Sequence, residues 1–224
     1  AGARVAVAAR RVEKLDDLVL EIEAEDGTAL AVAMDVTDTA SVEHALGKIE
    51  AALGTVTVLV NNAGVARPRS CLKVEEEDWD FVMDANLKGA WRVARLVAQR
   101  CIAGDLACSI VNIASILGLR VGFGESAYAT SKAGLVQLTR AMALELGRKG
   151  VRVNALCPGY FRTEMNEDYF DSEAGQSYIG YTPAQRVGEL NELDAPLLLL
   201  ASDAGSFING VALPVDGGHM VSSL

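Results

Sequence analysis

The feature that most constrains the fold is a regular alternation between short apolar runs and longer amphipathic stretches. The short runs are rich in Val, Ile and Ala and carry few charges, as is typical of parallel strands covered on both faces. The stretches between them have helical spacing, and several begin after Thr, Ser or Asp and end near Gly. This alternation predicts an α/β fold, in which helical crossovers join the strands of a doubly wound parallel sheet.

The pattern also predicts where the elements lie. Strands are expected at Arg4–Ala9, Ala29–Met34, Val56–Asn61, Ser109–Ile113, Val151–Leu156 and Val211–Val215. Helices are expected at Val12–Glu25, Ser41–Leu53, Glu75–Arg100, Ala127–Gly147 and Glu189–Ser202. No repeat or low-complexity segment interrupts the pattern, and 224 residues fit one hydrophobic core, so we expect a single domain over residues 1–224.

One segment, residues 160–187, departs from the alternation. It mixes aromatic residues with acids, Gly and Pro183. Loops of this length inside a compact domain are usually lids or binding loops. We therefore expect a substrate lid here, with a flexible surface excursion as the alternative.

Composition excludes several classes of protein. With 50% hydrophobic and 22% charged residues, the chain is too apolar for a disordered protein, and its net charge of −10 would repel nucleic acid. No apolar run approaches the roughly 20 residues of a membrane helix, and no signal-peptide pattern is present, so we expect a cytoplasmic protein without membrane or nucleic-acid partners. The cysteines lack metal-ligand spacing, which predicts buried reduced thiols and no metal site; they are Cys71, Cys101, Cys108 and Cys157.

The residues with the clearest chemistry are Ser115, Tyr128 and Lys132. Residues four apart on a helix share a face, so the Lys132 ammonium is expected to lower the pKa of Tyr128 from about 10. Tyr128 could then give a proton to a carbonyl oxygen. Ser115, at the carboxyl end of a predicted strand, could bind the same oxygen. The alternative is a solvated helix that carries Tyr and Lys by chance.

Further motifs accompany these residues in a fixed order along the chain. They are Val60-Asn61-Asn62-Ala63-Gly64 after a predicted strand, Asn86 in Asn86-Leu87-Lys88-Gly89, Ser115, Tyr128 with Lys132, and Pro158-Gly159 after the next strand. In this order they resemble the motifs of short-chain dehydrogenases/reductases, and the resemblance runs from Ala1 to Pro214-Val215-Asp216-Gly217-Gly218. It implies a Rossmann-type domain that binds NAD(P)(H) and transfers hydride between the nicotinamide and a carbonyl or alcohol carbon.

The resemblance also implies roles for the catalytic residues. Tyr128 would be the general acid/base, Lys132 would tune its pKa and bind the ribose, and Ser115 would bind the substrate oxygen. Asn86 would hold a water in the proton relay. An Asn that kinks its helix locally is the alternative for Asn86, and it is compatible with the relay.

Cofactor residues are assigned by the same resemblance. Asp35 and Val36 would contact the adenine, and Asn62-Ala63-Gly64 would form the turn beneath the adenine ribose. The segment along the nicotinamide would contain Pro158, Gly159, Phe161 and Thr163, with Thr163 bonding the carboxamide. Outside this resemblance, these residues are ordinary cap and turn residues.

Charge indicates which nucleotide is preferred. In NAD-binding relatives an acid at the end of a strand binds the ribose 2′-hydroxyl, whereas Arg accommodates a 2′-phosphate. Here the predicted strand ends Ala8-Ala9-Arg10-Arg11, without an acid at Ala9. Arg10 and Arg11 therefore favour NADP, with NAD possible; a solvated Arg pair is the alternative.

One departure from the family concerns its first strand and glycine-rich turn, which do not occur in these residues. Ala1-Gly2-Ala3 would correspond to the end of the family's first helix. The missing strand would be central, so we expect its neighbours to have exposed apolar edges. A longer gene product is the expected explanation, and a truncated, inactive relative is the alternative.

The expected function is an NADP-dependent carbonyl reductase or alcohol dehydrogenase. Its pocket would be lined by Ile116–Glu125 and by the lid. The apolar side chains there favour a medium-sized carbonyl compound such as a 3-oxoacyl thioester; they are Leu117, Val121, Phe123, Tyr160 and Phe170. Sugars, steroids and xenobiotic ketones stay open. The rival is a catalytically silent nucleotide-binding sensor or assembly subunit.

Assembly can be predicted from two helices, Glu75–Arg100 and Ala127–Gly147, which carry apolar residues on more than one face. The small residues Ala133 and Ala143 would let a second copy approach closely. With the family resemblance, this favours a homo-oligomer, most simply a tetramer. Packing of that face within the same subunit is the alternative.

Overall fold

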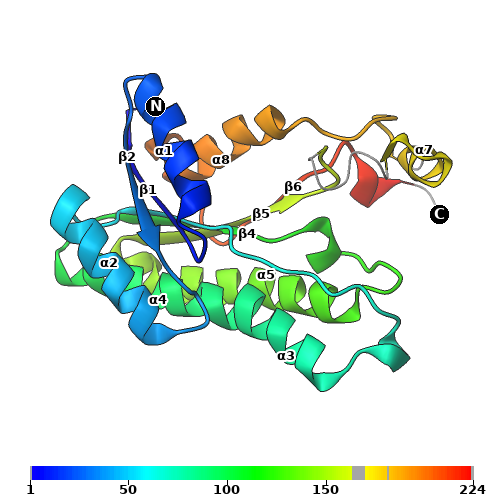
Figure 1. Ribbon diagram of the computed structural model, residues 1–224, viewed down its shortest axis with the longest axis horizontal. Coiled ribbons are helices and arrows are strands. Elements are labelled where there is room, and N and C mark those ends of the chain that lie inside the picture. The colour runs from blue at the N-terminus through cyan, green and yellow to red at the C-terminus, as the bar shows by residue number, and fades with distance from the viewer. Residues whose placement is uncertain (1, 163–169, 181, 223–224) are drawn as a thin grey trace.

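The computed structural model describes residues 2–162, 170–180 and 182–222, and in them helices cover both faces of parallel strands (Figure 1). The strands are β1 (Arg4–Ala9), β2 (Thr28–Ala33), β3 (Val58–Asn61), β4 (Cys108–Ile113), β5 (Val151–Pro158) and β6 (Ala212–Val215). Each lies within a few residues of its predicted position. Every strand pair is parallel, which confirms the α/β class read from the sequence.

Helices form the two covering layers. They are α1 (Glu13–Ala24), α2 (Thr39–Leu53), α3 (Glu76–Met83), α4 (Ala90–Ala103), α5 (Ser126–Leu146), α7 (Glu173–Ile179) and α8 (Asp194–Ala201). In Figure 1, α2, α4 and α5 lie on one side of the strands, and α1 and α8 lie on the other. No helix in the described ranges is long and apolar enough to cross a membrane.

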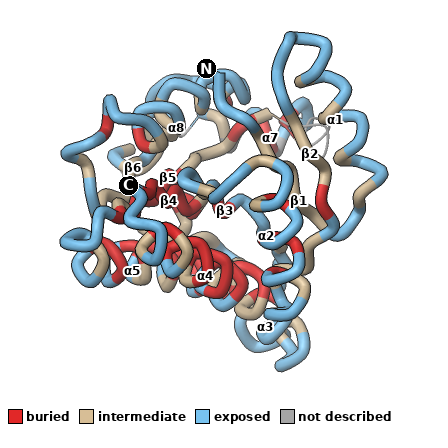
Figure 2. The backbone as a smooth tube through the Cα atoms, turned by 90° about the vertical axis from the view of Figure 1, so that its left-hand side faces the viewer, coloured by how far each residue is buried: buried red, intermediate tan, exposed pale blue. Residues whose placement is uncertain are grey.

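The core lies between the central strands and helices α4 and α5, where Figure 2 shows the buried residues gathered. Val97 of α4, Ile110 of β4 and Val153 of β5 belong to one apolar cluster there and are fully buried. On the opposite face, Leu200 of α8 packs with Val111 and Leu156. Burying each such side chain contributes roughly 1.5–3 kcal/mol to the stability of the fold.

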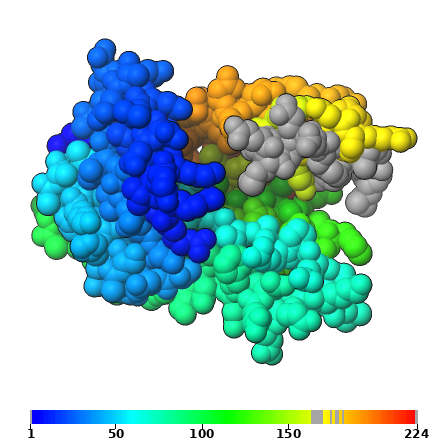
Figure 3. All heavy atoms as spheres, viewed as in Figure 1, coloured from blue at the N-terminus to red at the C-terminus, as the bar shows by residue number. Residues whose placement is uncertain are grey.

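The strands fall into two separate sets. β1 pairs with β2, and β3 to β6 pair in chain order, whereas β1 and β3 do not pair with each other. On β3, Val58 and Val60 are 47% and 38% exposed, which confirms the expected exposed apolar edge. Figure 3 shows a hollow on this side of the molecule, between the N-terminal segment in blue and the α8 region in orange.

The segment after β5 leaves the sheet and returns to the point where it left. The N–H of Gly188 donates to the carbonyl of Tyr160 at 2.9 Å, and the N–H of Arg162 donates to the carbonyl of Gly188 at 2.9 Å. Phe170 is 1% exposed and packs edge-on against Tyr160. The base of the segment is therefore anchored beside the carboxyl end of β5, and its action as a lid stays a prediction.

All the cysteines are free thiols, as predicted. Cys101, Cys108 and Cys157 are buried, but Cys71 is exposed, so the prediction of burial was wrong for that residue. Cys71 lies in a short turn (Cys71–Lys73) outside the core, where nothing covers its side chain among the described residues.

Candidate active site

The carboxyl end of β4 and the start of α5 bring Ser115 and Tyr128 to one cavity. Ser115 precedes a single 3₁₀ turn, Ile116–Gly118, and its Oγ accepts the N–H of Leu117 at 3.1 Å. The turn packs closely on α5, because a Cβ at Gly118 would lie 2.8 Å from the Lys132 carbonyl. The cavity is lined by Ala66, Ser115, Ile116, Leu117, Glu125, Tyr128, Gly159 and Tyr160.

The environment of Tyr128 raises its pKa above the ordinary value. Burial is the main cause, because it disfavours the charged phenolate, and the nearby Glu125 and Tyr160 act in the same direction. A hydrogen bond with Ser115 opposes them. The sequence predicted a lowered pKa, so this direction was wrong for the structure as it stands. A raised pKa keeps Tyr128 protonated at neutral pH and makes the phenol a weaker acid, so the proton leaves only when charge develops on the substrate oxygen.

Lys132 explains that difference. Its ammonium donates to the carbonyl of Ile113 at 2.7 Å and lies over the Tyr128 ring, 5.6 Å from the ring centroid. Burial lowers the pKa of Lys132 to about 8, because the side chain is only 4% exposed. The lysine is one helical turn from Tyr128, as predicted, but its ammonium donates its hydrogen bond to a backbone carbonyl and not to the phenol oxygen.

Asn86 is fully buried in a π-helical turn, Asp84–Gly89, between α3 and α4. Its Oδ1 accepts the N–H of Val65 at 2.8 Å, and its Nδ2 donates to the carbonyl of Val65 and to Oγ of Ser131. Such π turns often occur at functional sites, and this one matches the local helix distortion expected at Asn86. The side chain therefore ties the segment after β3 to α5, and the water-relay role stays a prediction.

The turn Asn62-Ala63-Gly64 follows β3 directly and reaches the same site. A Cβ at Gly64 would lie 3.5 Å from Nζ of Lys132 and 3.6 Å from Oδ1 of Asn86. The glycine therefore leaves the space beside the lysine ammonium open. A ribose hydroxyl fits such a position, since it can accept a hydrogen bond from an ammonium.

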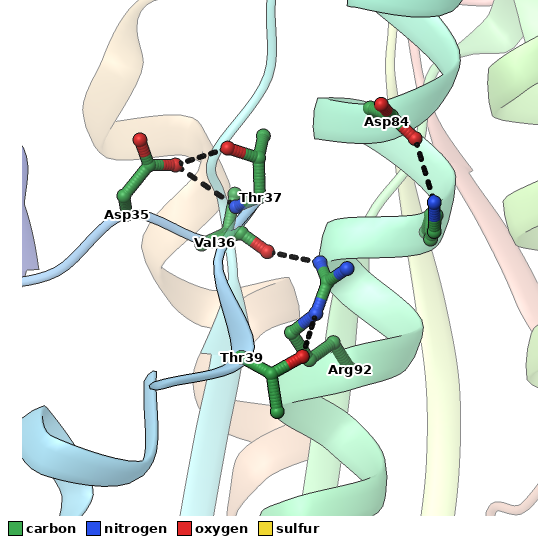
Figure 4. A network of polar contacts seen from close by, with 7 residues as sticks. Asp35, Val36, Thr37, Thr39, Asp84 and Arg92 are labelled. Atoms are coloured by element: carbon green, nitrogen blue, oxygen red, sulfur yellow. Dashed lines mark hydrogen bonds and ion pairs between the residues drawn. The ribbon is translucent and has the colours of Figure 1, made fainter. Parts of the chain in front are cut away.

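Asp35 and Val36 follow β2 and are held by the network in Figure 4. Oδ1 of Asp35 accepts the N–H and the hydroxyl of Thr37 at 2.9 and 2.7 Å, and these bonds lower its pKa. The buried guanidinium of Arg92 donates to the carbonyl of Val36 and, at 2.9 Å, to the hydroxyl of Thr39. Arg92, which the sequence interpretation missed, thus fixes the predicted adenine-contacting pair to α4.

Arg10 and Arg11 lie at the carboxyl end of β1 and are exposed. The charge of Arg10 contributes to the lowered pKa of Asp35, so the two side chains are near each other. This places a cation beside the predicted adenine pair. The position fits a nucleotide phosphate, and binding by Arg11 stays a prediction.

Pro158 is the last residue of β5, and Gly159, which follows it, lines the cavity. Gly159 approaches the residue after β6 so closely that a Cβ would lie 2.8 Å from Cα of Asp216. Phe161 is buried, and its ring lies against Gly188, where a Cβ would be 2.5 Å from the ring. Thr163 lies outside the described residues.

Some predicted pocket residues lie elsewhere. Leu117 and Tyr160 line the cavity, whereas Val121 and Phe123 are 88% and 98% exposed and do not line it. Phe170 is buried against Tyr160 and does not line it either. The sequence interpretation included Glu125 only as the end of a range. Its spacing from Tyr128 places both on one helix face, a signal that could have identified it.

Comparison with known proteins agrees with this fold. A family model described as Enoyl-(Acyl carrier protein) reductase matches residues 1–220. The chain is 36% identical over 209 residues to the 3-oxoacyl-(acyl-carrier-protein) reductase FabG of Thermotoga maritima, which covers 93% of this chain and 84% of that protein. It is 38% identical over 223 residues to the galactitol 2-dehydrogenase (L-tagatose-forming) of Cereibacter sphaeroides, covering 98% of this chain and 86% of that protein.

The fold is also similar to that of a solved structure. A gluconate 5-dehydrogenase from Burkholderia cenocepacia J2315, in complex with NADP and tartrate, matches with a TM-score of 0.93 at 35% identity, covering 99% of this chain and 87% of that one. Fold and similarity together define an NAD(P)-dependent oxidoreductase of the α/β class. The chain belongs to the short-chain dehydrogenase/reductase family.

Proposed function

We propose that this protein is an NADP(H)-dependent oxidoreductase that interconverts a ketone and a secondary alcohol. The observation that carries the proposal is the cavity in which Ser115 and Tyr128 meet, with Lys132 behind the Tyr128 ring. A phenol kept protonated by burial and a hydroxyl beside it can both bind one carbonyl oxygen. A catalytically silent sensor is not favoured, because these residues are all present and the relatives are named as reductases and dehydrogenases.

In the direction of reduction, Tyr128 gives its phenolic proton to the carbonyl oxygen as negative charge develops there. Ser115 donates a hydrogen bond to the same oxygen and orients it. The loss of a proton leaves a tyrosinate, which the Lys132 ammonium stabilises from the adjacent turn of α5. The nicotinamide, when bound, supplies or accepts the hydride.

The cofactor we propose is NADP. Arg10 would bind the ribose phosphate that distinguishes it from NAD, with Arg11 beside it, and Asp35 and Val36 would contact the adenine. Asn62, Ala63 and Gly64 would pass under the adenine ribose. The segment along the nicotinamide would include Pro158, Gly159, Phe161 and Thr163. The related gluconate 5-dehydrogenase was solved with NADP, which supports this choice.

The named activities of the relatives suggest two classes of substrate. A 3-oxoacyl thioester is suggested by the FabG relative, and the apolar Ile116 and Leu117 in the cavity favour it. A polyol or sugar-type ketone is suggested by the galactitol relative. The hydroxyl-bearing Tyr160 and the acid Glu125 in the same cavity favour that second class.

We further propose a cytoplasmic homo-oligomer, most simply a tetramer. The free cysteines suit a reducing compartment. Trp91 on α4 and Leu144 on α5 are 41% and 86% exposed, and a second copy would cover them.

The direct test is consumption of NADPH and NADH with a panel of ketones. We expect NADPH to be oxidised faster than NADH, with a ketone required in both cases. A protein that binds NADPH but reduces no ketone in the panel would favour the silent nucleotide-binding protein instead.

A further inference from the structure

Glu125 occupies the substrate cavity without a partner. It is the residue immediately before α5, and its side chain makes no capping hydrogen bond. Within the described ranges, no hydrogen bond or ion pair engages its carboxylate, although the side chain lines the cavity with Ser115 and Tyr128. Because the carboxylate has unused acceptors at a residue that lines the cavity, a ligand bound there can donate a hydrogen bond to it.

The surroundings of Glu125 limit what that donor can be. No positively charged side chain is among the described residues that line the cavity, and Glu125 is their only acid. Lys132 is not among the lining residues, and its ammonium donates to the carbonyl of Ile113. Partial burial raises the pKa of Glu125. An anionic substrate group would meet repulsion here, whereas a hydroxyl group would find an acceptor.

The spacing of Glu125 from the reacting centre indicates which hydroxyl it would bind. The N–H of Ala129 donates to the carbonyl of Glu125 at 2.7 Å, so Glu125 already follows the helical path of α5. Residues three apart on a helix have Cβ atoms about 5–6 Å apart. That separation suits a substrate whose carbonyl oxygen is at Tyr128 and whose hydroxyl is on the neighbouring carbon.

We propose that Glu125 is a specificity-determining residue that accepts a hydrogen bond from a hydroxyl group on the carbon next to the reacting one. The enzyme then prefers α-hydroxy ketones and their diol products to plain ketones, and it rejects α-keto acids. This inference rests on the proposed ketone reductase activity and chooses between its two substrate classes in favour of the sugar-type ketone.

The test uses ketones that share an ethyl group and differ only on the other side of the carbonyl. That side is a hydroxymethyl group, an ethyl group or a carboxylate. With NADPH and the wild-type protein, kcat/KM for the hydroxymethyl ketone is expected to exceed that for diethyl ketone by roughly 10- to 100-fold, the value of a hydrogen bond to a charged group. The α-keto acid is expected to be the poorest substrate.

Two variants assign this preference to the carboxylate. In Glu125→Met, kcat/KM for the hydroxymethyl ketone divided by kcat/KM for diethyl ketone falls to near one. In Glu125→Gln this ratio falls only partly, because the amide oxygen still accepts a hydrogen bond. Both variants improve the relative use of the α-keto acid. Glu43→Gln, which removes an exposed acid from α2, leaves all ratios unchanged and controls for net charge. Circular dichroism checks that each variant is folded.

The outcomes separate the inference from the function on which it rests. The role of Glu125 would be overturned if the wild type turned over all the ketones with kcat/KM ratios near one, or if the Glu125 variants left these ratios unchanged. Either result would leave the reductase activity standing. Absence of turnover with every ketone would contradict the proposed function and the inference together.

Discussion

Tyr128 is the residue on which the proposed chemistry depends. Helical spacing predicted its helix and its neighbour Lys132, but the direction of its pKa shift depends on burial, which residue spacing does not determine. In the structure burial outweighs the hydrogen bond with Ser115, so the phenol stays protonated at neutral pH. The protonated phenol is the form that ketone reduction requires.

Tyr128→Phe therefore removes the transferable proton and keeps the ring. We expect kcat for ketone reduction to fall by at least about 100-fold, the usual loss for a general acid. NADPH affinity, measured by fluorescence titration, should change little. A variant that retains near-normal turnover would contradict the role of Tyr128.

Lys132 carries a stability cost that can be measured. Its pKa in the folded protein is lowered from 10.5 to about 8, so between these values the unfolded chain binds more protons than the folded one. The free energy of unfolding therefore rises with pH across this window, and the full destabilisation is present below about pH 8. The shift corresponds to about 3 kcal/mol at most, of which the lost bond to Ile113 would cancel about 1 kcal/mol in a substitution.

Lys132→Met should thus be more stable than the wild type by about 1–2 kcal/mol at pH 7, and its advantage should shrink as the pH approaches 10. Chemical denaturation at several pH values measures this. The same variant should bind NADPH more weakly and reduce ketones more slowly. If the stability difference between Lys132→Met and the wild type did not change with pH, burial would not lower the pKa of Lys132.

Arg10 determines the proposed preference between nucleotides. Arg10→Ala should weaken the binding of NADPH by about 10-fold or more, as expected for the loss of a hydrogen bond between charged groups, and leave the binding of NADH nearly unchanged. Dissociation constants for both nucleotides test this. Equal losses for the two, or a wild-type preference for NADH, would return Arg10 to a solvated surface role.

At the scale of elements, hydrophobic periodicity was enough to predict the strands and most helix positions. It could not separate α3 from α4, because the π turn at Asp84–Gly89 interrupts hydrogen bonding without interrupting the apolar pattern. Periodicity also could not show which apolar residues of α5 that face away from its main apolar stripe are covered within the subunit. Val136 and Ala143 are buried there, and Ala143 lies against Gly210, whereas Ala133 is exposed.

The proposed assembly is therefore tested at Ala133. Ala143→Arg would insert a charge into the core of the subunit and destabilise it, so it cannot report on an interface alone. Ala133→Arg should halve the mass measured by light scattering and leave the helix content unchanged, because Arg is a good helix former. Glu43→Arg on α2 is the matched control. A wild type that is already a monomer would contradict the proposal.

At the scale of the whole molecule, the order of the motifs predicted the family and the fold class, and the missing first strand predicted the exposed apolar edge of β3. Ser115 and the turn after β3 follow the carboxyl ends of parallel strands, and the start of α5 brings Tyr128 to the cavity that Ser115 lines. What the sequence could not give is which side chains face the cavity. Val121 and Phe123 are apolar but exposed, whereas Glu125 is charged and lines the cavity. The path of the backbone between Gly118 and α5 determines which of these side chains reach the cavity.

The central claim is that this cavity reduces a ketone with hydride from NADPH. It is tested most directly with NADPH deuterated at the transferable position of the nicotinamide, the hydroxymethyl ethyl ketone as substrate, and mass spectrometry of the product. We predict a diol with a single deuterium on the new carbinol carbon, formed by the wild type and about 100-fold more slowly by Tyr128→Phe. A product without deuterium, or no diol although NADPH binds, would contradict the claim.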